Sequence, residues 1–329
     1  TSDGSRVYQA DEAARRATVH VIGDSGSNVN NGVETFLAAY LYGFNMTFLE
    51  RLSCAVRGES RRGDDVQLTI DADLQTYIAE RFPEDYNGAV ALLNYKTGEV
   101  LALYSKPEYD AKHPEDYEDA EDQTGVLLNR ATQGRYAPGS VFKIVTLACA
   151  LENLPGVQDR VFTCEGTYAV TEEMDLIDTD GEGHGALTLE EAFTKSCNIV
   201  FGQLALELGE EKLRATAERM GFNGNFLFED LIVYESIFPK AIEDEGELAW
   251  TGVGQGNLMA VPMHLAMIAG AVGNGGTMVE PQLVLSVRGA AGGVHSRLST
   301  RTALQCMSAS TAGIIESYMI ETVESGTAT

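Results

Sequence analysis

The chain has 329 residues, of which 44% are hydrophobic and 22% charged, and this length suffices for one large domain with a smaller attachment. Its formal net charge of −26 would repel nucleic-acid phosphates and anionic membranes, which disfavours a DNA- or RNA-binding role. The five cysteines and five histidines are scattered, without Cys-x-x-Cys pairing. We therefore expect no disulfide framework, no bound metal and no cofactor.

Residues 1–62 differ in composition from the rest, with Ser, Asn and Gly gathered around residues 23–32 and a basic cluster at residues 57–62. We expect a linker or small pedestal region there, followed by a larger domain of residues 63–329. No segment is apolar for long enough to cross a bilayer, and the first residue is Thr1 rather than Met. Any membrane anchor is therefore expected upstream of Thr1.

From residue 63 onward the patterning predicts regular elements. Apolar and polar residues alternate in the predicted strands at residues 65–71, 88–94 and 99–104, and a glycine turn joins the last two. Helical periodicity and end signals predict helices at about residues 72–81, 140–152, 189–195, 199–208, 210–220, 262–272 and 309–323. The acidic stretch of residues 108–122 is expected to be a solvated surface loop.

The sequence Ser140-Val-Phe-Lys143 follows Pro138-Gly139, which interrupts an extended segment and places Ser140 near the first turn of a helix. In that turn, backbone N–H groups lack intrahelical partners and the helix dipole favours a developing negative charge. Lys143 lies one turn further on the same face, with about 5–6 Å between the Cβ atoms. Because burial would depress the lysine pKa, the pair predicts a nucleophile and its base.

A second polar group, Ser196-Cys197-Asn198, lies between two helical patterns. A short turn would point Ser196 and Asn198 the same way, so that the hydroxyl could relay a proton from Lys143 and the amide could hold the lysine and a substrate peptide bond. Taken alone, the simpler interpretation is that Ser196 caps the helix that follows.

These two motifs resemble the Ser-x-x-Lys and Ser-x-Asn elements of the penicillin-binding serine enzymes. Other stretches resemble class B penicillin-binding proteins, the serine D,D-transpeptidases of peptidoglycan synthesis, in the family order: residues 68–75, 96–102, 129–143, 184–185, 196–201, 254–256 and 274–276. The resemblance covers about residues 63–329. It implies an α+β transpeptidase domain with an antiparallel sheet flanked by helices, and it favours a catalytic role for Ser196 and Asn198 over capping.

The family's third motif, a Lys-Thr-Gly strand, is not found after the predicted helices. Lys96-Thr97-Gly98 spells it but precedes the nucleophile and is expected in a hairpin turn. In the family, the third-motif strand donates an oxyanion-hole N–H, and later strands complete the sheet. We therefore expect the natural protein to continue past Thr329.

The resemblance implies that Ser140 attacks the penultimate D-alanine carbonyl of a stem peptide, with Lys143 as general base, Ser196 as proton relay and Asn198 as orienting amide. β-Lactams would acylate Ser140 in the same way. The implied partner is a polytopic glycan polymerase, at the extracytoplasmic face of a bacterial membrane. Two alternatives stay open: a serine β-lactamase or D,D-carboxypeptidase, and a non-catalytic scaffold with a transpeptidase-like fold.

Overall fold

The computed structural model describes residues 7–24, 26, 28–29, 31–44, 46, 48–58, 63–113, 125–289 and 293–328. The chain divides into two compact units. The first unit comprises residues 1–134, 226–234 and 280–301, and the second comprises residues 135–225, 235–279 and 302–329. Packing thus groups the first 62 residues with part of the segment that follows them. The predicted domain boundary at residues 62/63 stays a prediction.

The helices of the first unit are α1 (Glu12–Ile22), α2 (Val33–Phe36), α3 (Ala38–Leu41), α4 (Phe48–Arg57) and α5 (Ala72–Arg81). Its strands are β1 (Asp65–Leu68), β2 (Gly88–Leu93), β3 (Val100–Lys106), β8 (Phe226–Leu227), β9 (Ile232–Val233), β11 (Val284–Arg288) and β12 (Val294–Arg297). Strands β1, β11 and β12 form an antiparallel sheet, and β2 pairs with β3 in an antiparallel hairpin. The turn of that hairpin contains Lys96-Thr97-Gly98, as predicted.

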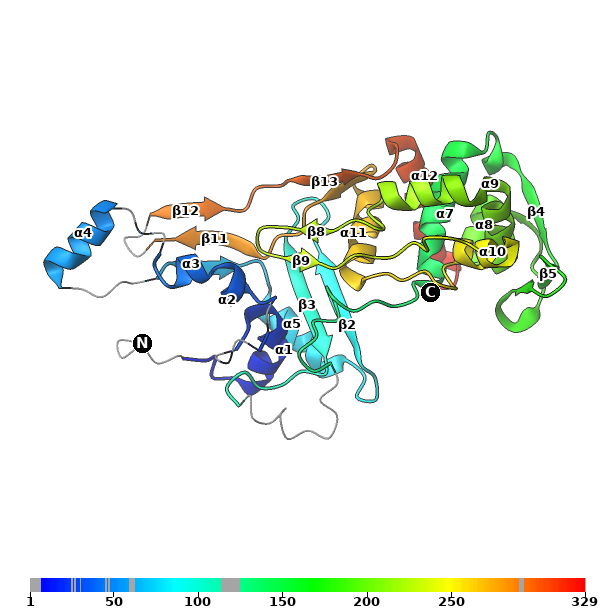
Figure 1. The fold of residues 1–329 in the computed structure, drawn as a ribbon. Helices are drawn as coiled ribbons and strands as arrows, with labels where there is room; N and C mark the ends of the chain where they lie inside the picture. The colour runs from blue at the N-terminus through cyan, green and yellow to red at the C-terminus, as the bar shows by residue number, and fades with distance from the viewer. Residues whose placement is uncertain are drawn as a thin grey trace. The chain divides into compact units, whose positions relative to one another are not determined.

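Helices α1 and α5 pack on β3 and on each other (Figure 1). Gln75, on α5, is fully buried and donates from Nε2 to the carbonyl oxygens of Ala17 and Leu103, at 2.7 and 2.8 Å. The side chain of Gln75 on α5 therefore links α1 and β3. This sheet-and-helix arrangement agrees with the α+β class expected from the resemblance.

Helix α1 was not predicted, because the Ser-Asn-Gly composition around it is typical of a linker. Asp11 caps the helix, and Arg15 on it forms a buried ion pair with Asp110 at 2.7 Å. The expectation of a solvated loop at residues 108–122 is therefore wrong at its start, where Tyr109 and Asp110 are each 2% exposed. Residues 114–124 lie outside the described part of the chain.

The first predicted strand also ends early, at Leu68 instead of Asp71. The carboxylate of Asp71 accepts hydrogen bonds from the backbone N–H groups of Asp73 and Leu74, so Asp71 is the N-cap of α5. Asp71 keeps an extended backbone, as N-cap residues usually do, but the pairing of β1 with β11 ends at Leu68.

The helices of the second unit are η1 (Gly139–Phe142), α7 (Lys143–Asn153), η2 (Val157–Asp159), η3 (Thr179–Gly181), α8 (Leu189–Thr194), α9 (Asn198–Arg219), α10 (Glu245–Val253), α11 (Pro262–Gly273) and α12 (Ala309–Ser325). Its strands are β4 (Val161–Cys164), β5 (Thr167–Ala169), β6 (Asp175–Ile177), β7 (Gly185–Thr188), β10 (Thr277–Val279) and β13 (Thr302–Gln305). The strand pairs are β4 with β7, β5 with β6, and β10 with β13, all antiparallel.

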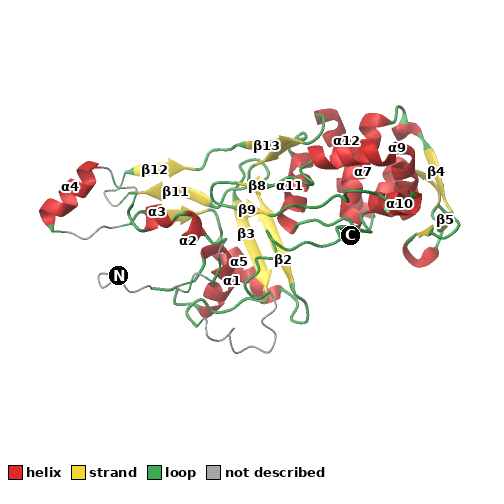
Figure 2. Cartoon of the chain, viewed as in Figure 1, coloured by secondary structure: helices red, strands yellow, loops and turns green. Residues whose placement is uncertain are grey.

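Helix α7 forms the centre of this unit and packs against α9, α10 and α12 (Figure 2). Its residues from Lys143 to Ala150 are all buried. A helix that is apolar around most of its circumference has to be buried in this way. The two helices predicted on either side of Gly209 are observed as α9, interrupted at Gly209 where φ is +76°. The core of the unit thus fixes α7, the helix that carries Lys143.

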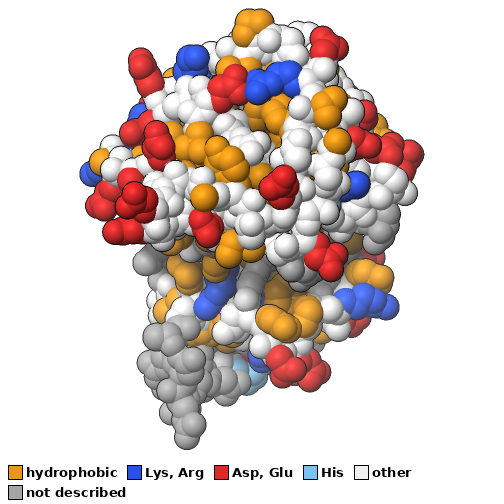
Figure 3. Space-filling model, turned by 90° about the vertical axis from the view of Figure 1, so that its right-hand side faces the viewer, with side chains coloured by type: hydrophobic (Ala, Val, Ile, Leu, Met, Phe, Trp, Pro, Cys, Tyr) orange, Lys and Arg blue, Asp and Glu red, His pale blue; other side chains and the backbone are white. Residues whose placement is uncertain are grey.

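Acidic side chains are spread over the face drawn in Figure 3, among fewer lysines and arginines, as the net charge requires. Within the described residues, no helix has both the length and the hydropathy needed to cross a bilayer.

Candidate active site

Ser140 lies in the 3₁₀ turn η1, which leads directly into α7. The N–H of Gly139 donates to the carbonyl oxygen of Gly254 at 2.9 Å. At Gly254 φ is +99°, and a Cβ there would lie 1.9 Å from the carbonyl oxygen of Gly139, so only glycine permits this approach. The contact fixes the turn so that Ser140 is exposed while Lys143 is only 1% exposed.

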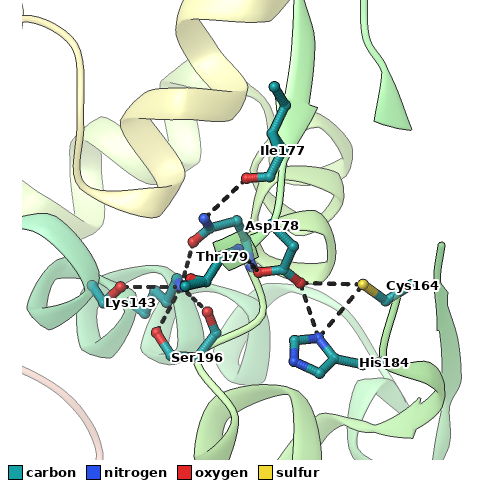
Figure 4. A network of polar contacts seen from close by, with 9 residues as sticks. Lys143, Cys164, Ile177, Asp178, Thr179, His184 and Ser196 are labelled. Carbon is teal, nitrogen blue, oxygen red and sulfur yellow. Dashed lines mark hydrogen bonds and ion pairs between the residues drawn. The ribbon is translucent and has the colours of Figure 1, made fainter. Parts of the chain in front are cut away.

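Four oxygen atoms surround Nζ of Lys143 (Figure 4). They are Oγ of Ser140 at 3.2 Å, Oγ of Ser196 at 2.9 Å, Oδ1 of Asn198 at 2.8 Å, and the backbone oxygen of Ser196. An ammonium group has three protons to donate, and a neutral amine has two protons and one lone pair. Only the two serine hydroxyls can donate to that lone pair, so a proton can pass between Ser140, Lys143 and Ser196.

Burial lowers the pKa of Lys143 to about 8, although the charges of Asp178 and Cys197 act in the opposite direction. Roughly a fifth of the lysine is then neutral near pH 7.4, compared with about one molecule in a thousand at the ordinary pKa. The sequence analysis required a lysine that is buried and can act as a base, and Lys143 meets this requirement.

Ser196 adopts a left-handed backbone conformation with φ of +56°, which is uncommon for a residue other than glycine. Its N–H donates to the carbonyl oxygen of Phe193, and helix α9 begins only at Asn198, with Cys197 as its N-cap. The capping interpretation of Ser196 is therefore wrong. The positive φ turns its hydroxyl toward Lys143 instead.

Asn198 is held on both sides of its amide. Its Oδ1 accepts from Lys143, while its Nδ2 donates to the carbonyl oxygen of Ile177 at 3.1 Å. Its backbone N–H donates to Oδ1 of Asp178 at 3.1 Å. The structure thus brings together all four predicted site residues, Ser140, Lys143, Ser196 and Asn198, and adds Asp178, which the sequence analysis missed.

Asp178 also belongs to a second cluster, in which Cys164, Asp178, His184 and Cys197 place their ligand-type atoms within 4.8 Å of one another. Hydrogen bonds from Cys197, from Cys164 and from backbone N–H groups lower the pKa of Asp178, against the opposing effect of burial. Burial raises the pKa of the Cys197 thiol. The sequence analysis expected no metal because these residues are scattered, but the fold gathers four potential ligands at one point.

A serine hydroxyl beside a buried lysine of lowered pKa, with a second hydroxyl and an amide on the same nitrogen, is the arrangement that nucleophilic acyl transfer requires. Residues 88–329 match the family described as "Penicillin binding protein transpeptidase domain". The chain belongs to this family.

Similar proteins include the peptidoglycan D,D-transpeptidase PbpA of Mycolicibacterium smegmatis, which is 30% identical over 242 residues, covering 68% of this chain and 49% of the relative. Stage V sporulation protein D of Bacillus subtilis is 34% identical over 219 residues, covering 64% of this chain and 33% of the relative. The chain thus spans about half the length, or less, of these curated relatives.

Solved structures are similar over nearly the whole chain. The penicillin G acyl-enzyme complex of penicillin-binding protein A from Mycobacterium tuberculosis has a TM-score of 0.87 at 28% identity, covering 98% of this chain and 79% of that one. The D,D-transpeptidase domain of a peptidoglycan glycosyltransferase from Eggerthella lenta has a TM-score of 0.83 at 31% identity, with coverages of 99% and 78%.

Proposed function

We propose that this protein is a peptidoglycan D,D-transpeptidase, which cross-links stem peptides through an acyl-enzyme at Ser140. The observation that carries the proposal is the convergence of Ser140, Ser196 and Asn198 on Nζ of the buried Lys143. The acyl-enzyme complexes that penicillin-binding protein A of M. tuberculosis forms with β-lactams support this choice.

In the first step, Oγ of Ser140 attacks the carbonyl carbon of the penultimate D-alanine, and its proton passes to the neutral amine of Lys143. The peptide C–N bond then breaks. The Ser196 hydroxyl passes a proton from Lys143 to the departing nitrogen, so that D-alanine leaves as an amine and an ester remains on Ser140. Asn198 holds the lysine and orients the substrate peptide bond.

In the second step, an amine of a neighbouring stem peptide attacks the ester and loses its proton to the same lysine and serine pair. The ester C–O bond breaks, Ser140 regains its proton, and a new peptide bond links the two strands. With a β-lactam, the bond that breaks is the ring amide. The ring nitrogen takes the proton but stays tethered, so the acyl-enzyme persists.

The proposal extends to location and partner. The protein acts at the extracytoplasmic face of a bacterial membrane, where peptidoglycan is assembled, together with a polytopic membrane glycan polymerase that supplies the glycan strands. The family resemblance supports both statements. A pull-down of the membrane-extracted full-length protein that fails to recover any multi-span protein would contradict the partnership.

The geometry favours catalysis over a scaffold role, because a protein without chemistry has no need of a buried lysine whose pKa is lowered to about 8. The test is to incubate the full-length protein with a donor peptide ending in D-Ala-D-Ala and an acceptor amine, and to quantify products by mass spectrometry. Free D-alanine together with cross-linked peptide is the expected result.

Ser140→Ala should abolish both products, whereas Ser317→Ala, which removes an exposed hydroxyl on α12, should leave them unchanged. Release of D-alanine without cross-linked peptide would identify a carboxypeptidase. A folded protein that yields neither product would support the scaffold alternative, and either of these results would overturn the proposal.

A further inference from the structure

We propose that a cavity in the first unit binds a primary ammonium group on a short alkyl chain, the chemistry of the side chain of lysine or of another diamino acid. The cavity has a volume of about 220 Å³. Its walls come from α2, α3, β11, β12 and the segments that follow β8, precede β11 and follow β12 (Figure 1). All of these belong to the first unit, whereas the four catalytic residues belong to the second, so this site shares no residue with the active site.

Asp230, which lines the cavity, is the residue that points to a ligand. It lies in the segment after β8 and is only 7% exposed. Its Oδ2 accepts hydrogen bonds from the backbone N–H groups of Leu283 and Val284, at 2.9 and 2.7 Å. Within the described part of the chain, no residue donates to its other oxygen, Oδ1. A buried carboxylate oxygen without a donor is unfavourable, so Oδ1 is the atom that a ligand would satisfy.

The charges around the cavity favour a cation. Three carboxylates and two guanidinium groups line it: Glu229, Asp230, Glu280, Arg297 and Arg301. Arg301 is paired with Glu280 at 3.0 Å and with Glu229 at 3.1 Å, rather than with Asp230. Burial raises the pKa of Asp230, and a neighbouring cation would lower it again. One added positive charge would therefore balance the carboxylates of the cavity.

Two observations favour an ammonium group over other cations. A guanidinium group binds a carboxylate best through two parallel hydrogen bonds, but Oδ2 of Asp230 already accepts two backbone N–H groups. A metal ion needs several ligand atoms around one point, and the only such group found among the described residues is the one at Cys164. An ammonium group is a compact charge with three donors, and a single oxygen is enough to anchor it.

The apolar part of the lining suits an alkyl chain. It is made by Phe36, Leu37, Val284, Val287 and Leu298. Walls of this kind cover the methylene groups of a lysine-like side chain while its charged end reaches a polar group. The volume is below the roughly 300–1,000 Å³ of sites for drug-sized molecules, so the cavity fits a side chain better than a larger ligand.

The proposed function supplies a ligand of this chemistry, because the acceptor stem peptide in its second step carries a free amine. The cavity would then hold the diamino-acid side chain of a stem peptide that is not in the active site. This choice of source rests on the proposed function, whereas the binding of an alkylammonium group does not.

The test measures binding to the full-length protein by isothermal titration calorimetry. n-Pentylammonium should bind once per chain, and n-pentanol, its neutral counterpart, should bind at least about tenfold more weakly. Nα-acetyl-lysine amide and its Nε-acetylated form should differ in the same way. Protein that carries penicillin on Ser140 should bind n-pentylammonium as tightly as the parent does, which separates this cavity from the active site.

Asp230→Asn should weaken the binding of n-pentylammonium by about 10-fold to 10²-fold. It removes the anionic oxygen but keeps an acceptor for the N–H groups of Leu283 and Val284. The matched control is Asp65→Asn, which changes an exposed aspartate on β1 outside the cavity and should bind like the parent. Glu280→Gln should also weaken binding, and it keeps the test valid if Asp230→Asn does not fold.

A stem peptide with a free side-chain amine should displace n-pentylammonium, whereas the same peptide with that amine acetylated should not. Displacement by neither peptide would overturn the stem-peptide source. The cavity assignment itself would be overturned if the folded parent bound no ammonium probe, if the parent and both cavity variants bound equally, or if penicillin on Ser140 abolished binding. Ammonium binding in a protein that forms no penicillin adduct would leave the cavity assignment intact and contradict the proposed function instead.

Discussion

The two halves of the candidate active site are held by different forces. Ser140 and Lys143 are positioned by α7, whose residues from Lys143 to Ala150 are buried, and by a glycine contact beneath η1. Ser196 and Asn198 are positioned by polar contacts, with a positive φ at Ser196 and hydrogen bonds from Asn198 to Asp178 and Ile177. The first half depends on hydrophobic packing and the second on a polar network.

This difference determines which substitutions should affect each half. Hydrophobic packing is non-directional and tolerates changes in neighbouring polar groups, whereas a buried polar network loses its geometry when one member is removed. Changes near Ser196 should therefore impair catalysis through position. Changes at Lys143 should impair it through chemistry.

The largest effect is expected for Lys143→Met, which keeps the volume of the buried side chain but removes the base. Acylation by penicillin should slow by about 10²–10⁴-fold. Stopped-flow measurement of the acylation rate checks this, with Lys212→Met, an exposed lysine on α9, as the control. A change of less than tenfold would show that another group takes the proton of Ser140.

A comparison of Ser196→Gly with Ser196→Ala separates the hydroxyl from the backbone. Both should slow acylation by about 10²-fold, since both remove the relay. Glycine tolerates the φ of +56°, whereas alanine, like the parent serine, costs about 1–2 kcal/mol there, so Ser196→Ala should have the lower Tm of the two variants. If Ser196→Gly reacts at the parent rate, the hydroxyl has no part in the proton transfer.

The pH dependence follows from the lowered pKa of Lys143. The neutral amine is the reactive form, so acylation should rise with pH below about 8 and level off above it. The expected slope is about tenfold per pH unit well below pH 8, which amounts to about 50-fold between pH 6 and pH 8. Rates measured from pH 5.5 to 9.5, with circular dichroism to verify folding, would contradict this account if they were flat or still rising at pH 9.5.

The smallest effect should come from Thr188→Ala, which removes the capping box that Thr188 forms with Glu191 at the start of α8. The cost should be about 1 kcal/mol of stability, or roughly 1–2 °C in Tm, by thermal unfolding. The acylation rate at 25 °C should stay within about twofold of the parent, because α8 carries no site residue. A large loss of rate without a change in Tm would place α8 in the catalytic machinery.

Local patterns were sufficient for part of this structure. The Ser140 and Lys143 pair could be predicted because both residues lie within one helical turn, and helix α5 was predicted with its observed bounds from its helical pattern. The approach of Ser196 and Asn198 to Lys143 joins residues far apart in the sequence. That prediction depended on the family resemblance.

The rest could not be predicted from spacing. Cys164, Asp178, His184 and Cys197 come from separate strands and turns, so only the fold reveals that their side chains meet. Helix α1 was missed because its stability depends on tertiary contacts such as the Arg15–Asp110 ion pair. The periodicity of the sequence does not indicate such contacts.

The most direct test of the account is the intact mass of the full-length protein after incubation with penicillin G, followed by peptide mapping. The account predicts one penicillin per chain, located on the peptide that contains Ser140. The adduct should be absent from Ser140→Ala and present in Ser317→Ala. A folded parent protein without an adduct, or with the adduct on another residue, would contradict the assignment of Ser140 as the nucleophile.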